Sequence, residues 1–457
     1  MKKSTALHAC MAHAPSESVT YAPSGFAAIA MIVASTLSTS ALAQNLTQLY
    51  ESASTYDATY QSAKSQYEAN LARAAQAKAG LYPTAGLAAG INRSNIDNTN
   101  PDITRNPTSQ NITINAAQPL YRPANKATAE QGDKQADLAK TTLATAEQDL
   151  IVRLAQAYFD VLASNDSLAF VKAQKAAVAE QLASAKRNFE VGTSTITDTR
   201  EAQARFDLVI AQEIAAENDL RVKKLALDQL VGKTNADPRP VALPLALPPV
   251  VPGDVNAWVA QSEQEHPSLK AAQLALEVAQ LETRKAEAGH KPTIDAVASY
   301  GINRSMNIAP ANNRANTASI GVQLNLPLFA GYAIQNRVKE TLQLEDKARN
   351  DLEGAKRSIS QATRTAFFGV QSGQGQVKAL EAAEASSQSA LDANKLGYQV
   401  GVRINIDVLN SQSQLFQTKR DLAKARYDVL VGGLKLRQAN GTLKAEDLAQ
   451  VNNLLAK

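Results

Sequence analysis

Cysteine is nearly absent from this chain of 457 residues, which contains only Cys10. A single cysteine excludes an intramolecular disulfide and any metal site built from several thiolates. Aromatic residues account for 5% of the sequence, whereas alanine is frequent throughout. Such small side chains favour the close packing of long helices over a thick globular core.

Long apolar runs and a strong charge of one sign are also missing. After Gln44 no run approaches 18 consecutive apolar residues, so the sequence predicts no transmembrane helix. The formal net charge is only +4. A nucleic-acid-binding chain needs a strongly basic face, so no nucleic-acid partner is expected.

Catalytic chemistry has little support in the sequence. The histidines that follow Gln44 are His266 and His290, and neither has another metal ligand at the usual spacing. Glycine-rich phosphate loops and nucleophile motifs are missing as well. We therefore expect no enzyme, no cofactor and no metal site, and we expect both histidines to lie on ordinary polar surface.

The first 43 residues have the pattern of a signal peptide. Lys2 and Lys3 give a basic start, residues 26–37 supply a short apolar core, and Ala41-Leu42-Ala43 offers a cleavage site. The apolar core is too short to span a bilayer as a mature helix. We therefore expect residues 1–43 to be removed and the protein to be exported.

The remainder of the chain is duplicated. Four short segments recur in the same order, 208 to 211 positions later: GLYPT at 80 as GHKPT at 289, GINRS at 90 unchanged at 301, PLY at 119 as PLF at 327, and FEVG at 189 as YQVG at 398. Ordered recurrence of this kind indicates a repeated structural unit. The predicted organisation is a first repeat, a proline-rich linker with an equatorial segment, a second repeat and an equatorial tail, over residues 44–233, 234–263, 264–441 and 442–457.

Each repeat contains one very long helical segment. Residues 124–191 and 332–400 lack proline, and a helix of this length would extend for about 100 Å. Gly192 and Gly401 follow them, where glycine can adopt the left-handed conformation that ends a helix. Shorter helices are predicted to return over 196–230 and 404–437.

The helical segments carry apolar stripes that indicate neighbours. In the second returning helix a strict heptad indicates left-handed supercoiling, and its positions are Val408, Leu415, Leu422, Val429 and Leu436. The first long helix carries two displaced stripes, so it is expected to pack on two sides, as the wall of a tube requires. Trp258, the only tryptophan, is expected to pack a short connector helix.

Each repeat also carries two segments with the period of a β-strand. Apolar and polar residues alternate around 87–91, 112–114, 294–302 and 318–326, and polar loops are expected at 95–110 and 306–316. Strands of about ten residues suit a tilted membrane-spanning strand. A strand pair with one packed face in a soluble protein remains the alternative. Four strands cannot close a barrel in lipid, whereas three copies would supply twelve.

With its duplicated helices and strand pairs, the chain resembles the TolC family of outer-membrane efflux and secretion channels. The segment beginning at Tyr398, YQVGVRINIDVLNSQSQLFQTKRDLAKARYDVLVGGLKLRQANGTLKAEDL, is similar to the terminal repeat of that family, and FEVGTSTITD at 189–198 is its counterpart. The resemblance covers essentially all of 44–457. It implies a mainly α fold with a small β part, in which a homotrimer forms a twelve-stranded outer-membrane β-barrel continued by an α-helical coiled-coil barrel in the periplasm.

The resemblance also implies a function and partners. Channels of this family are exit ducts of tripartite efflux pumps or type I secretion systems, sit in outer-membrane lipid and extend into the periplasm. Their closed periplasmic tip opens when a periplasmic adaptor and an inner-membrane transporter of the RND, ABC or MFS type dock. The alternatives are a periplasmic adaptor, which would need a lipoyl-like motif and a membrane anchor, and a trimeric adhesin, which would need a long passenger. Neither set of features is visible.

The resemblance assigns candidate gate residues near the helix-ending glycines. Asp198, Tyr398 and Arg403 fall at positions that tie the closed tip together, and Asp407 falls at a position that faces the pore as a threefold acidic ring. Asn410 stands where the best-known members carry a second aspartate, so we expect weaker binding of cations here. The plainer alternative is that these charged residues only solvate helix ends.

Overall fold

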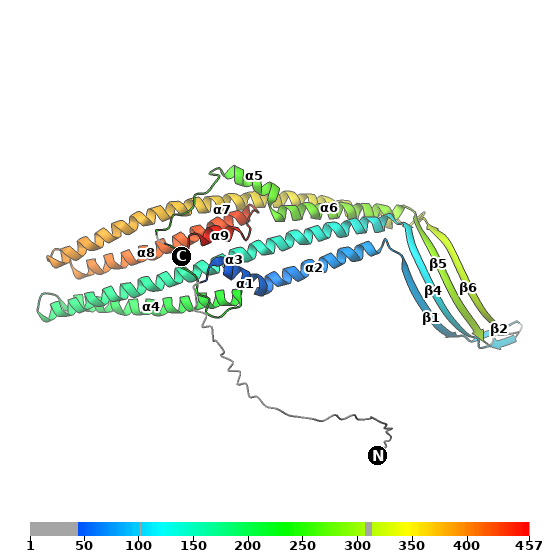
Figure 1. Ribbon diagram of the computed structural model, residues 1–457, viewed down its shortest axis with the longest axis horizontal. Helices are drawn as coiled ribbons and strands as arrows, with labels where there is room; N and C mark the ends of the chain where they lie inside the picture. The colour runs from blue at the N-terminus through cyan, green and yellow to red at the C-terminus, as the bar shows by residue number, and fades with distance from the viewer. Residues whose placement is uncertain (1–43, 101, 243, 307–312, 457) are drawn as a thin grey trace, which may run out of the picture. The chain divides into compact units, whose positions relative to one another are not determined.

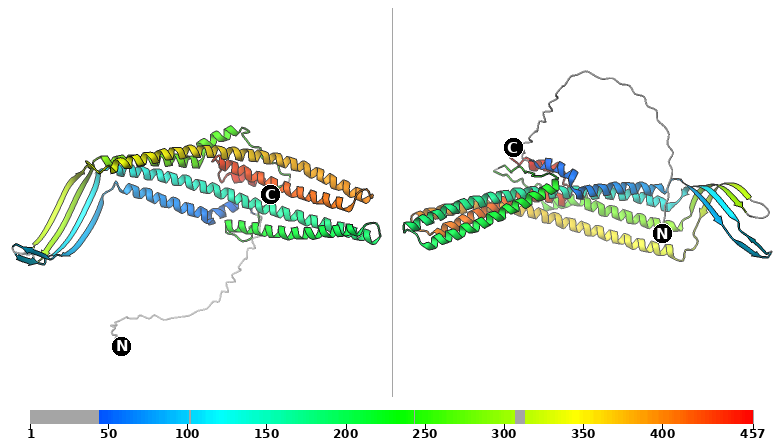
Figure 2. Two further views of the ribbon diagram at one scale, coloured as in Figure 1. Left: turned by 180° about the vertical axis from the view of Figure 1, so that it is seen from behind. Right: turned by 90° about the horizontal axis from the view of Figure 1, so that it is seen from below.

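The computed structural model describes residues 44–100, 102–242, 244–306 and 313–456 (Figure 1). The predicted signal peptide, 1–43, lies outside these residues. Among the described residues two long helical hairpins lie side by side, and a curved sheet continues from their far ends (Figures 1 and 2). The mainly α fold with a small β part is therefore confirmed.

The long helices have nearly the predicted bounds. Two hairpins form when α3 packs against α4 and α7 packs against α8, with the bounds Pro123–Glu190, Ile196–Val231, Ala333–Gln399 and Asn405–Ala439. Helix α3 is 68 residues long and α7 is 67. Proline at the first position of α3 suits a helix start, because its missing N–H would have no partner there.

The shorter helices complete the duplication. They are α1, α2, α5, α6 and α9, with the bounds Leu46–Tyr56, Ala58–Ala79, Val255–Glu265, Pro267–Glu287 and Asp447–Asn452, and a 3₁₀ turn at Ala288–His290. Both α2 and α6 pack along α3 and lead into strands. One order of elements, helix, two long strands, long helix and returning helix, thus occurs twice, which confirms the duplicated fold.

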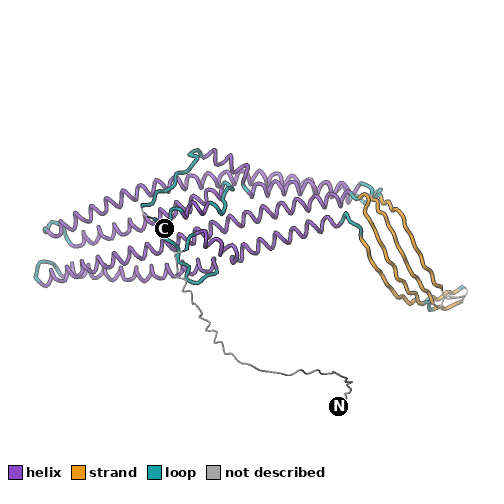
Figure 3. Tube along the Cα trace, viewed as in Figure 1, coloured by secondary structure: helices purple, strands orange, loops and turns teal. Residues whose placement is uncertain are grey.

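The four long strands form one antiparallel sheet (Figure 3). Its order is β1-β4-β5-β6, with the bounds Thr84–Arg93, Thr108–Tyr121, Thr293–Met306 and Asn313–Asn325. Strands β1 and β6 are its two edges, and within the described part of the chain each has one neighbour. A single chain therefore leaves two rows of backbone hydrogen-bonding groups unpaired.

The prediction of a polar loop at 95–110 is wrong in part. Strands β2 (Ile96–Thr99) and β3 (Asp102–Arg105) pair there as a short hairpin, and β4 already begins at Thr108. Each of the two short strands has four residues, which is too few for a period of two to be recognised. Thr104 donates a side-chain hydrogen bond to Asp97 at 2.7 Å across the pair. The second expected loop, 306–316, lies mostly outside the described residues.

The strand register divides the sheet into an apolar and a polar face. Because residues directly opposite in a ladder share a face, one face carries continuous rows such as Leu87–Ile114–Tyr300–Ala318 and Ala85–Ala116–Ala298–Ile320. The other face carries asparagine, threonine, serine and glycine, for example the row Ala88–Thr113–Gly301–Thr317. Ile320 is 89% exposed in the single chain. An apolar face this exposed needs an apolar environment outside the chain.

Exposed aromatic residues cluster where the sheet joins the helices. Tyr82, Tyr121, Phe329 and Tyr332 are between 45% and 73% exposed, and the rings of Phe329 and Tyr332 pack edge to face at 5.5 Å. Amphipathic rings prefer the boundary between lipid chains and water. A cluster of exposed aromatic residues at one end of an apolar face is typical of a surface that meets a membrane interface.

The largest core lies at mid-length of the helices, around α3. Of the two predicted stripes of α3, one is buried there and the other is half buried, against residues of α1, α4, α8 and α9 and the proline-rich linker. The buried residues are Leu150, Leu154 and Val161 of the first stripe and Ile151, Ala155, Tyr158 and Leu162 of the second, whereas Leu143, Ala146 and Ala157 are partly buried. The predicted heptad of α8 is buried at all five positions. Tyr158 in this core donates a hydrogen bond to the carbonyl of Arg239 at 2.8 Å, which fixes the linker to α3. Burial raises the pKa of Tyr158, so its hydroxyl remains a donor.

The connector helix and the histidines have simple structural roles. Trp258 is buried in α5, as predicted, and its indole N–H donates to the Pro252 carbonyl at 2.8 Å. His290 is exposed, as expected. The same expectation is wrong for His266, which is half-buried and caps α6 by accepting the backbone N–H of Ser268 at 3.1 Å. Burial lowers the pKa of His266 and keeps it in the neutral form that can accept this bond.

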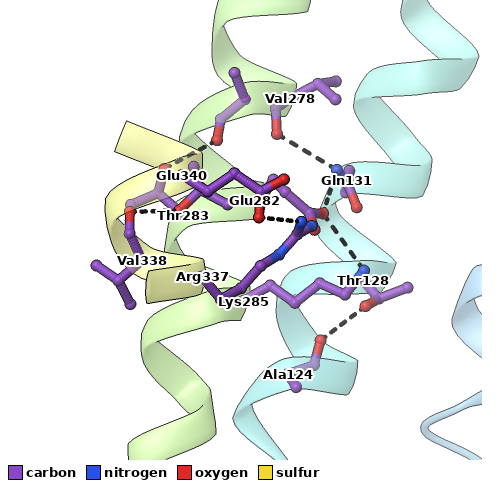
Figure 4. Close-up of polar contacts among 12 residues, drawn as sticks. Ala124, Thr128, Gln131, Val278, Glu282, Thr283, Lys285, Arg337, Val338 and Glu340 are labelled. Atoms are coloured by element: carbon purple, nitrogen blue, oxygen red, sulfur yellow. Dashed lines mark hydrogen bonds and ion pairs between the residues drawn. The ribbon is translucent and has the colours of Figure 1, made fainter. Parts of the chain in front are cut away.

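A polar cluster near the sheet fastens the two repeats together (Figure 4). Glu282 of α6 accepts from Arg337 of α7 at 2.7 Å and from Gln131 of α3 at 3.2 Å, and Lys285 lies 3.4 Å away. Burial alone would raise the pKa of Glu282, but these donors outweigh burial and hold the pKa below its usual range. The charged carboxylate therefore joins three helices close to where the strands begin.

Candidate gate at the hairpin tips

The tip of the first hairpin is closed by its own side chains. Gly192 turns the chain after α3 with a φ of +77°. Thr195 and Asp198 then form a capping box at the start of α4, in which the Thr195 hydroxyl accepts the Asp198 N–H and the Asp198 carboxylate accepts the Thr195 N–H at 3.0 Å. Ser194 donates to the same carboxylate at 2.7 Å. Burial opposes ionisation, but these hydrogen bonds outweigh it and lower the pKa of Asp198.

The tip of the second hairpin lacks such a cap. Gly401 turns the chain with a φ of +78°, and Ile404 then occupies the capping position without a side-chain acceptor. Val400, Val402 and Ile404 are each more than 60% exposed. This tip is therefore more apolar and has less local stabilisation than the first.

Arg403 and Asp407 form a charge pair at this second tip, at a separation of 3.6 Å. Both side chains are largely accessible to solvent, at 57% and 34%. An exposed pair of this kind contributes about 0–1 kcal/mol. Within one chain it cannot hold the tip in place.

Contacts between the hairpins hold the second tip against the first. Asn188 of α3 donates to the Tyr398 hydroxyl of α7 at 3.2 Å, and Arg205 of α4 donates to the Asn410 side chain of α8 at 2.7 Å. Asn405, which is 1% exposed, lies between Tyr398 and Asn410 in sequence. All three residues of the second repeat contact the first repeat.

Asn405 makes the most enclosed of these contacts. Its amide donates to the backbone carbonyl of Asp198 at 3.3 Å, and its carbonyl oxygen accepts from Gln181. One buried side chain at the start of α8 is thus tied to both helices of the first hairpin. A buried polar group costs free energy when it loses its partners, so separating the hairpins here is unfavourable.

The residues assigned by resemblance are only partly brought together. Within the described part of one chain, the Asp198 carboxylate bonds to Ser194 and Thr195, Tyr398 bonds to Asn188, and Arg403 pairs with Asp407. Asp407 and Asn410 lie on successive turns of α8, and Asn410 is exposed while bound to Arg205. A direct tie from Asp198 to Arg403 would have to form between neighbouring chains.

Sequence reasoning missed Asn188, Gln181 and Asn405. A signal for Asn405 was present in the duplication, because the FEVGTSTITD and YQVGVRINID segments place it opposite the apolar Ile196. A polar residue where the repeat has an apolar one indicates a position with a partner of its own. The partner could not be named, because Gln181 lies on the other hairpin.

Comparison with known proteins shows which family has this architecture. The model of a family described as outer membrane efflux protein matches residues 49–233 and 258–442. The chain belongs to the outer membrane efflux protein family.

The alignments with two curated relatives cover nearly the full length of this chain. Outer membrane protein TolC of Vibrio cholerae serotype O1 is 34% identical over 420 residues, which are 91% of this chain and 95% of the relative. The TolC protein of Escherichia coli K12 is 32% identical over 426 residues, covering 91% and 86%. A crystal structure of a membrane protein from Pseudomonas aeruginosa superposes with a TM-score of 0.77 at 20% identity, over 87% of this chain and 92% of that one. This last likeness shows the shared fold.

Membership in the efflux protein family fixes location and class. The chain is an exit channel of the outer membrane that extends into the periplasm, and its relatives are channel proteins rather than enzymes. The adaptor alternative is not favoured. Along the described part of the chain, we find no helix with the length and apolar character needed to cross a bilayer.

Proposed function

We propose that three copies of this chain close one barrel of twelve strands and one helical tunnel, and that this assembly is the exit duct of a tripartite efflux pump or a type I secretion system. The observation that carries the proposal is the strand register, which gives a continuous apolar face and leaves β1 and β6 as open edges. In lipid an unpaired edge is costly, so β6 of one copy must pair with β1 of the next. Residues 44–233 and 264–441 are the proposed repeats, joined by 234–263 and followed by the tail 442–457.

The hairpin tips form the proposed gate at the periplasmic end. In the trimer, Asp198, Tyr398 and Arg403 tie neighbouring tips together, with Gly192 and Gly401 as the turns. Docking of a periplasmic adaptor and an inner-membrane transporter, of RND, ABC or MFS type, separates the tips. A gate of this kind needs a closed state favoured by only a few kcal/mol, because binding of the partners must reverse it. Modest, partly exposed contacts of the kind seen at these tips suit that requirement.

One relative bears on the class of cargo. The alkaline protease secretion protein AprF of Pseudomonas aeruginosa is 31% identical over 341 residues, covering 74% of this chain and 71% of the relative. This supports secreted polypeptides as one class of cargo alongside small molecules. Selectivity is then expected to come from the docked transporter.

The block of the pore by divalent cations tests whether Asp407 and Asn410 line a ring at the constriction of the proposed trimer. Three carboxylates and three amides should attract divalent cations less than six carboxylates, because each added charge strengthens the attraction. We expect the wild-type trimer in a planar lipid bilayer to need millimolar divalent cation for block. Asn410→Asp combined with Arg205→Gln should lower the blocking concentration by roughly tenfold, and Asn410→Asp alone should lower it less, because Arg205 lies against the new carboxylate.

Two companion variants complete this experiment. Asp407→Asn should weaken the block further, and Asn410→Asp is also measured together with Arg205→Gln, since Arg205 would otherwise neutralise the new carboxylate. Micromolar block of the wild-type pore would contradict the assignment of these positions to the constriction. So would an unchanged blocking concentration in both Asn410→Asp and the combination of Asn410→Asp with Arg205→Gln.

A further inference from the structure

Three arginines occupy the apolar face of the sheet at the end farthest from the helices. Arg304 of β5 and Arg314 of β6 lie directly opposite each other in the row Ile91–Gln110–Arg304–Arg314. Arg93 of β1 lies on the same face, one row farther out. Below this row the five residues that β5 places on this face run from Ile302 back to Ile294 and carry no charge, although Asn316 of β6 lies opposite Ile302 and Gln118 of β4 lies opposite Ala296.

The height of this row follows from strand geometry. Arg304 is ten residues beyond Ile294, the first apolar residue of this face on β5. Ten residues extend for about 34 Å along an antiparallel strand, and a tilt of about 40° reduces the height to about 26 Å. The apolar band of an outer-membrane barrel is about 25 Å tall. The arginine row therefore falls at the outer edge of the band, at the level of the lipid headgroups.

These arginines have no counter-charge within the described part of the chain. All three are exposed, and no acidic side chain there forms an ion pair with any of them. Like charges directly opposite in a ladder destabilise the pair, so Arg304 and Arg314 oppose folding as they stand. Asp97 on β2, the first acidic residue after Arg93 in the chain, accepts a hydrogen bond from Thr104. An anion bound between the two guanidinium groups would remove this repulsion.

We propose that Arg304 and Arg314 form a binding site for the phosphate groups of an anionic lipid in the outer leaflet, with Arg93 on the same face two strands away from Arg304. The guanidinium fork matches phosphate geometry, and two forks side by side favour a headgroup with more than one phosphate. The apolar rows below, including Ile302 and Ile112, receive the acyl chains of the same lipid. This inference rests on the proposed trimeric barrel, because only closure turns the apolar face toward lipid on all sides.

Native mass spectrometry of the purified trimer tests the site. The wild-type protein and the double variant Arg304→Gln/Arg314→Gln are each incubated with diphosphorylated lipid A, with the dephosphorylated lipid, or with diphosphorylated lipid A plus excess inorganic phosphate. We expect the double variant to bind the diphosphorylated lipid at least tenfold more weakly and the dephosphorylated lipid equally. Inorganic phosphate should not displace the lipid, because it lacks the apolar chains.

The control is Arg349→Gln/Arg357→Gln, which removes two exposed arginines of α7 outside the sheet and should bind like the wild type. Equal binding of diphosphorylated lipid by the wild type and by Arg304→Gln/Arg314→Gln would overturn the site, as would displacement by inorganic phosphate. The same spectra distinguish a wrong lipid site from a wrong barrel. If trimers are seen but bind lipid without selectivity, only the lipid site is wrong. If only monomers are seen, the proposed trimeric channel is wrong as well.

Discussion

Replacing Asn405 with aspartate is expected to increase the single-channel conductance of the trimer several-fold in planar lipid bilayers. The side chain is buried between the hairpins, donates to the Asp198 carbonyl and accepts from Gln181. A carboxylate of nearly the same shape cannot donate, and it would place a negative charge against the carbonyl oxygen. Leaving a buried polar group without its hydrogen bond costs about 1–3 kcal/mol. With three copies around the axis, the closed tip should lose most of its advantage over the open one.

The matched control for this variant is Asn394→Asp. Asn394 is half-buried on the second hairpin, but it donates to Ser411 within the same hairpin. Its substitution should leave the conductance close to the wild-type value. In the same series Arg403→Ala should raise conductance because it removes a proposed contact between chains, and Asp407→Ala should do so because Arg403 loses its charge partner. Arg357→Ala, which breaks an exposed pair elsewhere on α7, should leave conductance unchanged. Unchanged conductance in Asn405→Asp, Arg403→Ala and Asp407→Ala together would leave the tip without a role in closure.

Ile320→Lys is expected to abolish trimers in the outer membrane. The residue lies on the apolar face in the middle row of β6 and is 89% exposed. In a soluble protein such a change would cost little, but a lysine near the bilayer midplane costs about 2–4 kcal/mol in an outer-membrane barrel. Three copies would bear that cost three times. The measurement is the amount of heat-modifiable trimer in outer-membrane fractions.

Ser319→Lys is the control for the barrel prediction. Ser319 is the preceding residue, lies on the opposite face and hydrogen-bonds to Ser299 at 2.8 Å. In the barrel this face lines the polar interior, so a lysine there should be tolerated and should change only ion selectivity. Equal trimer yields for the two variants would show that the two faces do not divide lipid from water.

The sequence predicted the elements better than it predicted their contacts. Long uninterrupted helices, the turns at Gly192 and Gly401 and the alternation in the long strands depend on local patterns, and these features are readable from neighbours in the chain. The β2–β3 hairpin was missed because strands of four residues carry too little alternation. The role of Asn405 was missed because it depends on how two hairpins pack across a separation of 224 positions from Gln181.

The candidate gate comes from the family resemblance, and the structure shows which contacts its residues make within one chain. The resemblance assigns Arg403 to a contact with Asp198, but within one chain Arg403 reaches only Asp407 among the described acidic side chains. At the tips, the two hairpins of a single chain are joined instead by three side-chain pairs: Asn188 with Tyr398, Gln181 with Asn405 and Arg205 with Asn410. None of these three pairs uses the Arg403 guanidinium or the Asp198 carboxylate, which are the two groups proposed to meet between neighbouring chains.

Cysteine cross-linking across the sheet edges tests the central claim most directly. Residues 44–457 contain no cysteine, so Leu87→Cys on β1 can be combined with Ala318→Cys, Ile320→Cys or Val322→Cys on β6, all on the apolar face. A disulfide needs Cβ atoms about 3.5–4.5 Å apart, so three pairs are tried to find the register. A ring of three copies predicts that one oxidised pair yields a covalent trimer and nothing larger on a non-reducing gel. Monomers in all three pairs, or dimers that never extend to trimers, would contradict the account.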